Sequence, residues 1–303
     1  MIEILNIFYL LLICSIIFSF PLNNIYLIKK FALEKFSFFE IYSINILFVL
    51  TIFFIFSFFN INIYLIFFSI LFLSLVNFFY TDWKFVIKNL YLLIFFILFF
   101  IVFSSEISTY PYLEWDAAVN WVFKTLNFKN DYTFQNLENV PGFVGYPHVG
   151  PYLWSFFWKI SLVDHEYTGR LSFIFIYLVI FFSLVGKLKV NDFLKIIILI
   201  FLIVISYNRI ILNGYQEPLM FSLCLIFLIL FEKINESKNN FHIYLFLIIC
   251  ANLILWIKNE GVCFLIFLSF FILFKKQIIK KDKLKLLSFF VSLFTIKKII
   301  FVY

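Results

Sequence analysis

Carboxylates that could do chemistry are concentrated in one polar stretch, residues 105–169, of an otherwise strongly apolar chain. The stretch contains seven of the 17 acidic residues and two of the three histidines. A carboxylate in the bilayer core costs several kcal/mol, so in a chain that is 64% hydrophobic we expect this stretch to lie outside the membrane. At the membrane edge, partial removal from water raises the pKa of a carboxyl group toward neutrality, which suits it to general-base catalysis.

Asp116 and Glu114 are the candidate catalytic residues of this stretch. They flank Trp115 at the predicted start of an amphipathic helix over 114–126. Asp116 could take a proton from a substrate hydroxyl, and Glu114 competes with it for that role. Alternatively, Asp116 only places a favourable negative charge in the first turn of a helix.

Two short motifs, NGYQEP and WIKNEG, add further candidate substrate-binding residues. The first contains Tyr215 and Glu217, and the second contains Lys258 and Glu260. A cation beside a cleft that opens to lipid suits recognition of a lipid phosphate. The same residues are also ordinary at a helix start and in a tight turn between two helices, so both interpretations stay open.

Three more candidates follow in the polar stretch and just after it. Tyr146 and His148 lie in the motif GYPHVGPY, whose prolines and glycines predict a rigid turn. His148 could bind an anion or hold a substrate hydroxyl. Arg170 opens the next apolar run, where it could extend to the membrane interface or bind a phosphate with its planar fork.

The composition predicts the elements that must position these residues. A mean hydropathy of +1.05 and only 14% charged residues indicate a polytopic membrane protein rather than a soluble domain. Apolar runs of this length and uniformity favour helices over the strands of a membrane barrel. We therefore expect a single all-α domain over 1–303, a transmembrane helical bundle of about ten spans. The predicted spans are 4–28, 41–59, 61–79, 90–104, 170–186, 194–212, 215–231, 242–257, 261–274 and 286–303.

Lysines predict the direction of these spans. Alternate connections between them hold 16 of the 24 basic residues, so all of these connections can be cytoplasmic at once. The N-terminus, the loop 105–169 and the two short motifs then share the outer face. The segment 149–163 is expected to be a helix lying in the outer interface, not a span. The first apolar run lacks a basic leader and a cleavage site, so we expect it to stay as an anchor.

Several function classes find no support in the sequence. The net charge of +7 comes from lysines in short connections, an orientation signal that does not indicate a nucleic-acid partner. The four cysteines fall in or beside apolar runs without metal-ligand spacing, so no metal and no cofactor are expected. Phosphate-binding loops, Ser-His-Asp patterns and HExxH are absent from the sequence.

The motifs together resemble the GT-C superfamily of integral-membrane glycosyltransferases. The likeness is closest to the bacterial branch of lipid A aminoarabinose transferases and protein O-mannosyltransferase-like proteins. WDAAVNWVFKTLNF, followed by GYPHVGPYLWSFFWKISLVDHEYTGRLSF, is similar to the family's first large outer loop. GYQEPLMF resembles the segment that opens a later span, and WIKNEGVCF resembles a Lys-Asn-Glu-Gly turn of bacterial members.

The resemblance implies an inverting glycosyltransferase with a GT-C-like fold. It would move a sugar from a polyprenyl-phosphate donor to a hydroxyl of a lipid, glycan or protein acceptor. Asp116 would be the base, Arg170 and Lys258 would bind the lipid phosphate, and Glu217 and Glu260 would orient acceptor or sugar. The implied location is the bacterial inner membrane, among membrane lipids, with the loop 105–169 on the periplasmic side.

The sequence also differs from this family in two respects. His148 stands where the aminoarabinose transferases have a lysine, and three spans precede the span that leads into the loop. Two other hypotheses therefore stay open. One is a non-catalytic transporter or flippase for a lipid-linked glycan. The other is a truncated relative that acts only as a membrane interaction partner.

Overall fold

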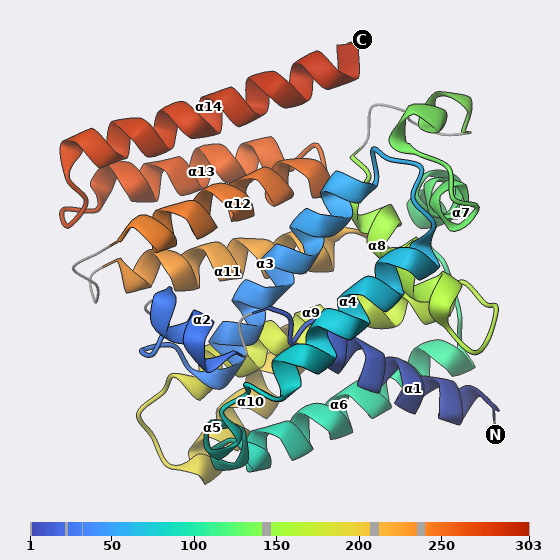
Figure 1. Cartoon of the computed structure of the whole chain (residues 1–303), viewed down its shortest axis with the longest axis horizontal. Coiled ribbons are helices and arrows are strands. Elements are labelled where there is room, and N and C mark those ends of the chain that lie inside the picture. Colours follow the sequence, from blue (N-terminus) through green and yellow to red (C-terminus); the bar gives the residue numbers. More distant parts are fainter. Residues whose placement is uncertain are drawn as a thin grey trace.

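A computed structural model describes residues 2–21, 24–31, 33–140, 147–206, 212–234 and 240–302. Within these ranges the regular structure is helical, with one isolated bridge between Asn24 and Thr81 (Figure 1). The longer helices are α1 (Ile2–Ile17), α3 (Phe38–Phe56), α4 (Ile63–Phe78), α6 (Leu90–Thr109), α9 (Tyr167–Gly186), α10 (Asp192–Ser206), α11 (Glu217–Lys233), α12 (Phe241–Ile257), α13 (Gly261–Phe274) and α14 (Lys280–Val302). The shorter ones are α2 (Ile25–Lys30), α5 (Trp83–Lys88), η1 (Ala117–Trp121), α7 (Val122–Lys129), η2 (Phe134–Asn139) and α8 (Val149–Ile160).

The predicted all-α class is confirmed, and the apolar helices indicate a membrane protein. Among the described residues, α3, α6 and α9 are long and apolar enough to cross a membrane. Helices α1, α4, α12 and α13 are apolar but shorter, so the figure of about ten spans remains a prediction. Helix α9 lies at the centre and is buried along almost its whole length, in contact with α3, α6, α8 and α11.

The first predicted span, 4–28, is wrong as one continuous helix. Helix α1 ends at Ile17, the chain turns, and a separate short helix α2 begins at Ile25. Pro21 explains the break, because proline has no N–H to donate and disfavours helical geometry in the residue before it.

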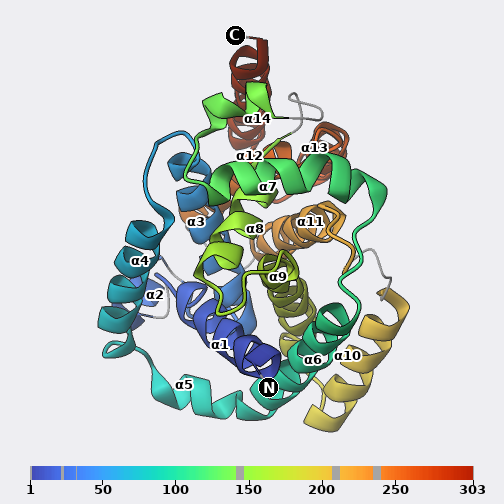
Figure 2. The same cartoon turned by 90° about the vertical axis from the view of Figure 1, so that its right-hand side faces the viewer.

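The lysine-rich connections and the polar motifs occupy opposite ends of the bundle. In Figure 1, α2, α5 and the α13–α14 connection lie toward the left, whereas α7 and α8 lie toward the right. At the lysine-rich end, ion pairs connect α11 to its neighbours. Glu232 pairs with Lys187 at the end of α9, and Lys233 Nζ lies 3.6 Å from Oε1 of the buried Glu40 in α3. We call the other end the polar end. Figure 2 looks onto it and shows α7 lying across the ends of bundle helices.

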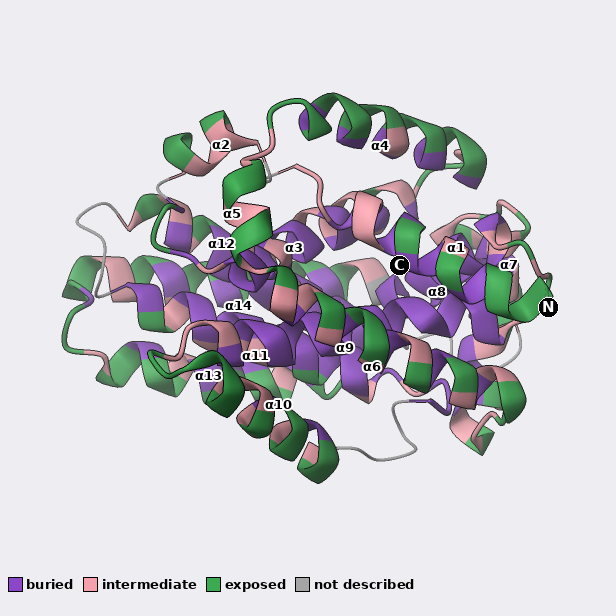
Figure 3. Cartoon of the chain, turned by 90° about the horizontal axis from the view of Figure 1, so that it is seen from below, coloured by how far each residue is buried: buried purple, intermediate pink, exposed green. Residues whose placement is uncertain are grey.

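Helix α8 belongs to the polar end and does not cross the bundle. Its N-cap residue, His148, hydrogen-bonds Ser57, while near its last turn the Lys159 carbonyl accepts a hydrogen bond from Tyr64. Ser57 and Tyr64 flank the single turn between α3 and α4, so both ends of α8 lie near the same end. The helix is nevertheless not an exposed interfacial one, because nearly all its residues are buried (Figure 3). Protein covers its surface where lipid was expected.

Close packing of α8 on α9 depends on Gly169. A methyl group at this position would lie 2.1 Å from the carbonyl oxygen of Trp154, a backbone atom that cannot move aside cheaply. The contact explains the glycine in the first turn of α9, where other residues have higher helix propensity.

Candidate functional site

The carboxylate of Asp116 is held by two side chains of the turn that follows it. Asn120 donates from Nδ2 to Oδ1 at 2.5 Å, and Trp121 donates from Nε1 to Oδ2 at 3.0 Å. These donors stand four and five residues after Asp116. In the wider π-helical turn η1, both donors lie on the same face as Asp116. Such turns are frequent at functional sites. Asp116 is thereby oriented while it remains partly exposed.

Glu114 lies in the loop between α6 and η1 and connects this loop to the NGYQEP motif. Its backbone N–H donates to the Asn213 carbonyl at 3.2 Å, and its carboxylate accepts from Asn213 Nδ2 at 3.3 Å. The next residue, Gly214, has φ of +85°, a conformation that favours glycine. A methyl group there would also approach Trp154 and Ala117 closely. The glycine therefore allows the two segments to lie side by side.

Lys258 joins the NGYQEP and WIKNEG motifs. Its Nζ lies 2.5 Å from Glu217 Oε1 and 4.0 Å from Glu260 Oε1. Pro218 in the first turn of α11 suits the helix start that presents Glu217. Burial lowers the pKa of Lys258, but its hydrogen bond to Glu217 and the nearby carboxylates outweigh this effect and raise it. Lys258 is therefore charged at neutral pH.

All three motifs converge around Tyr215, because Glu114 contacts Asn213 and Lys258 contacts Glu217. Partial burial and the carboxylates of Glu114, Asp116 and Glu217 raise the pKa of its phenol. Lys258 lies close enough to oppose this effect. The structure thus brings together six of the nine predicted site residues, which we call the carboxylate cluster. Its members are Glu114, Asp116, Tyr215, Glu217, Lys258 and Glu260.

Lys124 lies near Asp116, and the sequence did not predict it as a site residue. Its side chain is only 1% exposed and lies 5.7 Å from the Trp121 ring. Burial lowers the pKa of Lys124 to about 7, although Asp116 opposes this shift. A lysine on an amphipathic helix is usually on the solvated face, so the sequence carried no signal for its burial.

His148 is covered by protein and does not reach the surface. It is fully buried among aromatic rings that include Phe58, Phe134 and Trp256, and its Nε2 lies 2.7 Å from Ser57 Oγ. Burial lowers the pKa of His148 far below its ordinary value, with a further contribution from Lys124. A neutral, covered imidazole does not fit the expected anion-binding role. The other candidate of this turn, Tyr146, lies outside the described residues.

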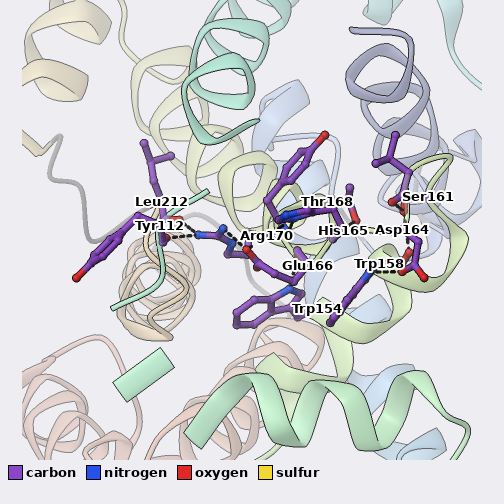
Figure 4. Close-up of polar contacts among 12 residues, drawn as sticks. Tyr112, Trp154, Trp158, Ser161, Asp164, His165, Glu166, Thr168, Arg170 and Leu212 are labelled. Atoms are coloured by element: carbon purple, nitrogen blue, oxygen red, sulfur yellow. Dashed lines mark hydrogen bonds and ion pairs between the residues drawn. The ribbon is translucent and has the colours of Figure 1, made fainter. Parts of the chain in front are cut away.

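Arg170 is directed at oxygen atoms of the protein itself (Figure 4). Its guanidinium donates to the Tyr112 carbonyl at 2.9 Å, to the Leu212 carbonyl, and to Glu166 Oε1 at 2.6 Å. The side chain is fully buried. Because its fork is directed at protein oxygens, the expected phosphate contact does not fit. Arg170 instead connects the loop after α6 to the segment before α11.

The cluster can move protons and bind polar ligands. The carboxylates of Asp116, Glu217 and Glu260 and the phenol of Tyr215 lie around one charged lysine, Lys258. The side chains of Glu217 and Glu260 remain 39% and 52% exposed. Over the described part of the chain, no group of three His, Cys, Asp or Glu residues has a metal-binding arrangement. Comparisons with family models, curated proteins and solved structures found no match to this chain.

Proposed function

We propose that this protein is an inverting, GT-C-like glycosyltransferase that uses a polyprenyl-phosphate-linked sugar. The observation that supports this proposal is the convergence of three motifs, far apart in sequence, into the carboxylate cluster at one end of an apolar helical bundle. A lipid-linked donor must present its reacting head at a membrane surface. A partly exposed carboxylate beside a lysine is the pairing that such a transfer needs.

In this proposal Asp116 is the general base. It takes the proton of the acceptor hydroxyl while that oxygen forms a bond to the anomeric carbon. The bond between that carbon and the phosphate oxygen breaks, and the lipid phosphate leaves with the electron pair. Lys258 stabilises the departing anion, and Glu217, Glu260 and Tyr215 hydrogen-bond sugar or acceptor hydroxyls.

Asn120 and Trp121 support the assignment of Asp116 over Glu114. Each oxygen of the Asp116 carboxylate accepts one of these hydrogen bonds, which orients the carboxylate without covering the side chain. Glu114 instead hydrogen-bonds Asn213 in the contact that joins two loops. We further propose a bacterial inner membrane location with the cluster on the periplasmic face, and a lipid, glycan or protein acceptor.

The test is sugar transfer by the purified protein in lipid bilayers, with a panel of polyprenyl-phosphate sugars. We expect turnover with one donor and its loss in Asp116→Asn. Asp164→Asn is the matched control, because Asp164 belongs to the same polar stretch but pairs with Lys129 outside the cluster. Equal turnover in Asp116→Asn would exclude this residue as the base. Donor binding and translocation across vesicles without turnover would favour the transporter.

A further inference from the structure

An apolar groove runs between α13 and α14, outside the carboxylate cluster. Its volume is about 400 Å³. Leu265 and Phe290 are buried at its base, while Ile266 and Val291 line it with 57% and 65% of their surface exposed. Ser269 is the one polar residue of the lining, and its hydroxyl already donates to the Leu265 carbonyl at 2.7 Å. The groove therefore offers a ligand hydrocarbon contacts only.

The length and volume of the groove favour a narrow ligand. It follows α13 from Val262 to Leu273. At 1.5 Å per residue this is roughly 17 Å, close to the roughly 15 Å depth of one leaflet of hydrocarbon. A helix of about 10 Å diameter could place only a ridge of its side chains in such a groove. A single hydrocarbon chain, in contrast, can lie within the groove along its whole length.

One end of the groove adjoins the carboxylate cluster and carries cations. Val262 follows directly after the WIKNEG turn. On α14, Lys297 donates to Asn259 Oδ1 of that turn at 3.1 Å, and Lys298 holds its Nζ 5.7 Å from the ring of Phe294, which lines the groove. Lys298 is exposed. An anionic group at this end would meet a positive charge directly beyond the apolar surface.

We propose that the α13–α14 groove binds the hydrocarbon chain of one lipid with an anionic head, which lies at the Lys298 end. The occupant is a membrane lipid phosphate, drawn from the bilayer around the helices. The bound head would then lie beside the WIKNEG turn, which carries Lys258 and Glu260. This is a binding proposal, and it does not require that the cluster transfers a sugar.

The direct test is photo-crosslinking in nanodiscs of zwitterionic lipid. The probe is hexadecyl phosphate with a diazirine in its chain, and the labelled peptides are mapped by mass spectrometry. We expect labelling to concentrate on α13 and α14 and to fall when unlabelled hexadecyl phosphate is added. Equal labelling of the exposed apolar faces of α4 and α10 would overturn the proposal, because it would show only lipid that surrounds the protein.

Ser269→Trp tests the groove itself, because an indole there would occupy the space of the chain. Ser292→Trp on the exposed face of α14 is the matched control: both hydroxyls donate to the carbonyl four residues earlier, and Ser292 does not line the groove. Each buried CH₂ contributes a several-fold gain in affinity, so we expect about tenfold less labelling in Ser269→Trp alone. Unchanged labelling in this variant would contradict the proposal.

Lys298→Met tests the position of the head. We expect it to abolish the preference of the groove for hexadecyl phosphate over hexadecanol, while Lys283→Met, at the other end of α14, leaves the preference intact. The opposite result would place the head at the lysine-rich end and overturn the stated orientation. The probe carries no sugar, so labelling can succeed where transfer fails, and the two proposals fail separately.

Discussion

Replacing Lys124 by methionine is expected to stabilise the protein at neutral pH. Burial lowers the pKa of this lysine from 10.5 to about 7 in the folded protein. At about 1.4 kcal/mol per pKa unit, folding with the lysine charged costs roughly 5 kcal/mol. Methionine is similar in length and carries no charge, so Lys124→Met should remove most of this cost while it keeps packing against Trp121.

The pH dependence of stability gives the prediction its sign. Between pH 7 and 10.5 the unfolded chain binds a proton at Lys124 that the folded protein has released, so stability rises with pH across this window. Below pH 7 Lys124 is charged in both the folded and the unfolded state, so the full free-energy cost of burying its charge is present. From pH 7 to 9 the wild-type protein should gain about 2 kcal/mol from this residue, or roughly 4 °C in Tm. Lys124→Met should lack this increment.

The assay is thermal unfolding of the purified protein in detergent at pH 6, 7, 8 and 9. Lys84→Met is the control, because Lys84 is exposed at the other end of the molecule. It should leave both Tm and its pH dependence close to wild type. If Lys124→Met lowers Tm at pH 7, or retains the wild-type increase toward pH 9, the buried lysine is not the source of the penalty and the reasoning fails.

Three further predictions concern the site and its orientation. Trp121→Phe removes the Nε1 donor to Asp116, so kcat of sugar transfer should fall about tenfold while KM changes little. A change in KM alone would contradict a positioning role for Trp121. Arg170→Lys loses the fork that reaches two carbonyls and Glu166, so denaturant unfolding should show a loss of about 2 kcal/mol or more; wild-type stability would contradict the clamp. In a cysteine-free background on intact cells, an impermeant maleimide should label Glu138→Cys and not Lys280→Cys; the reverse would move the cluster to the cytoplasmic face.

Much of the fold was predictable because hydropathy and charge are read locally along the chain. Each long apolar run became helical, since a chain in lipid must satisfy its backbone groups internally. The lysine pattern correctly separated two ends of the bundle, because orientation signals lie in the connections themselves. The exception was the break between α1 and α2, where Pro21 was visible but the apolar run around it suggested continuity.

The candidate site was predictable only in part. Because the polar motifs were expected on one face, the proximity of Glu114, Asp116, Glu217 and Lys258 could be anticipated from alternation of the spans. The roles of His148 and Arg170 could not. Both have side chains suited to anions, but whether such a group meets a ligand or a protein oxygen depends on residues that are distant in sequence.

The sequence by itself determined the all-α class, the apolar character and the polar motifs, because these follow from residue types and their spacing. Only the tertiary structure decided which polar groups are covered and which remain open. The burial of Lys124 beside Asp116, the covering of α8, and the π-helical turn that places two donors on one carboxylate all arise from packing between elements. Such contacts depend on distances of a few ångströms across the fold, and these are not encoded in any local pattern.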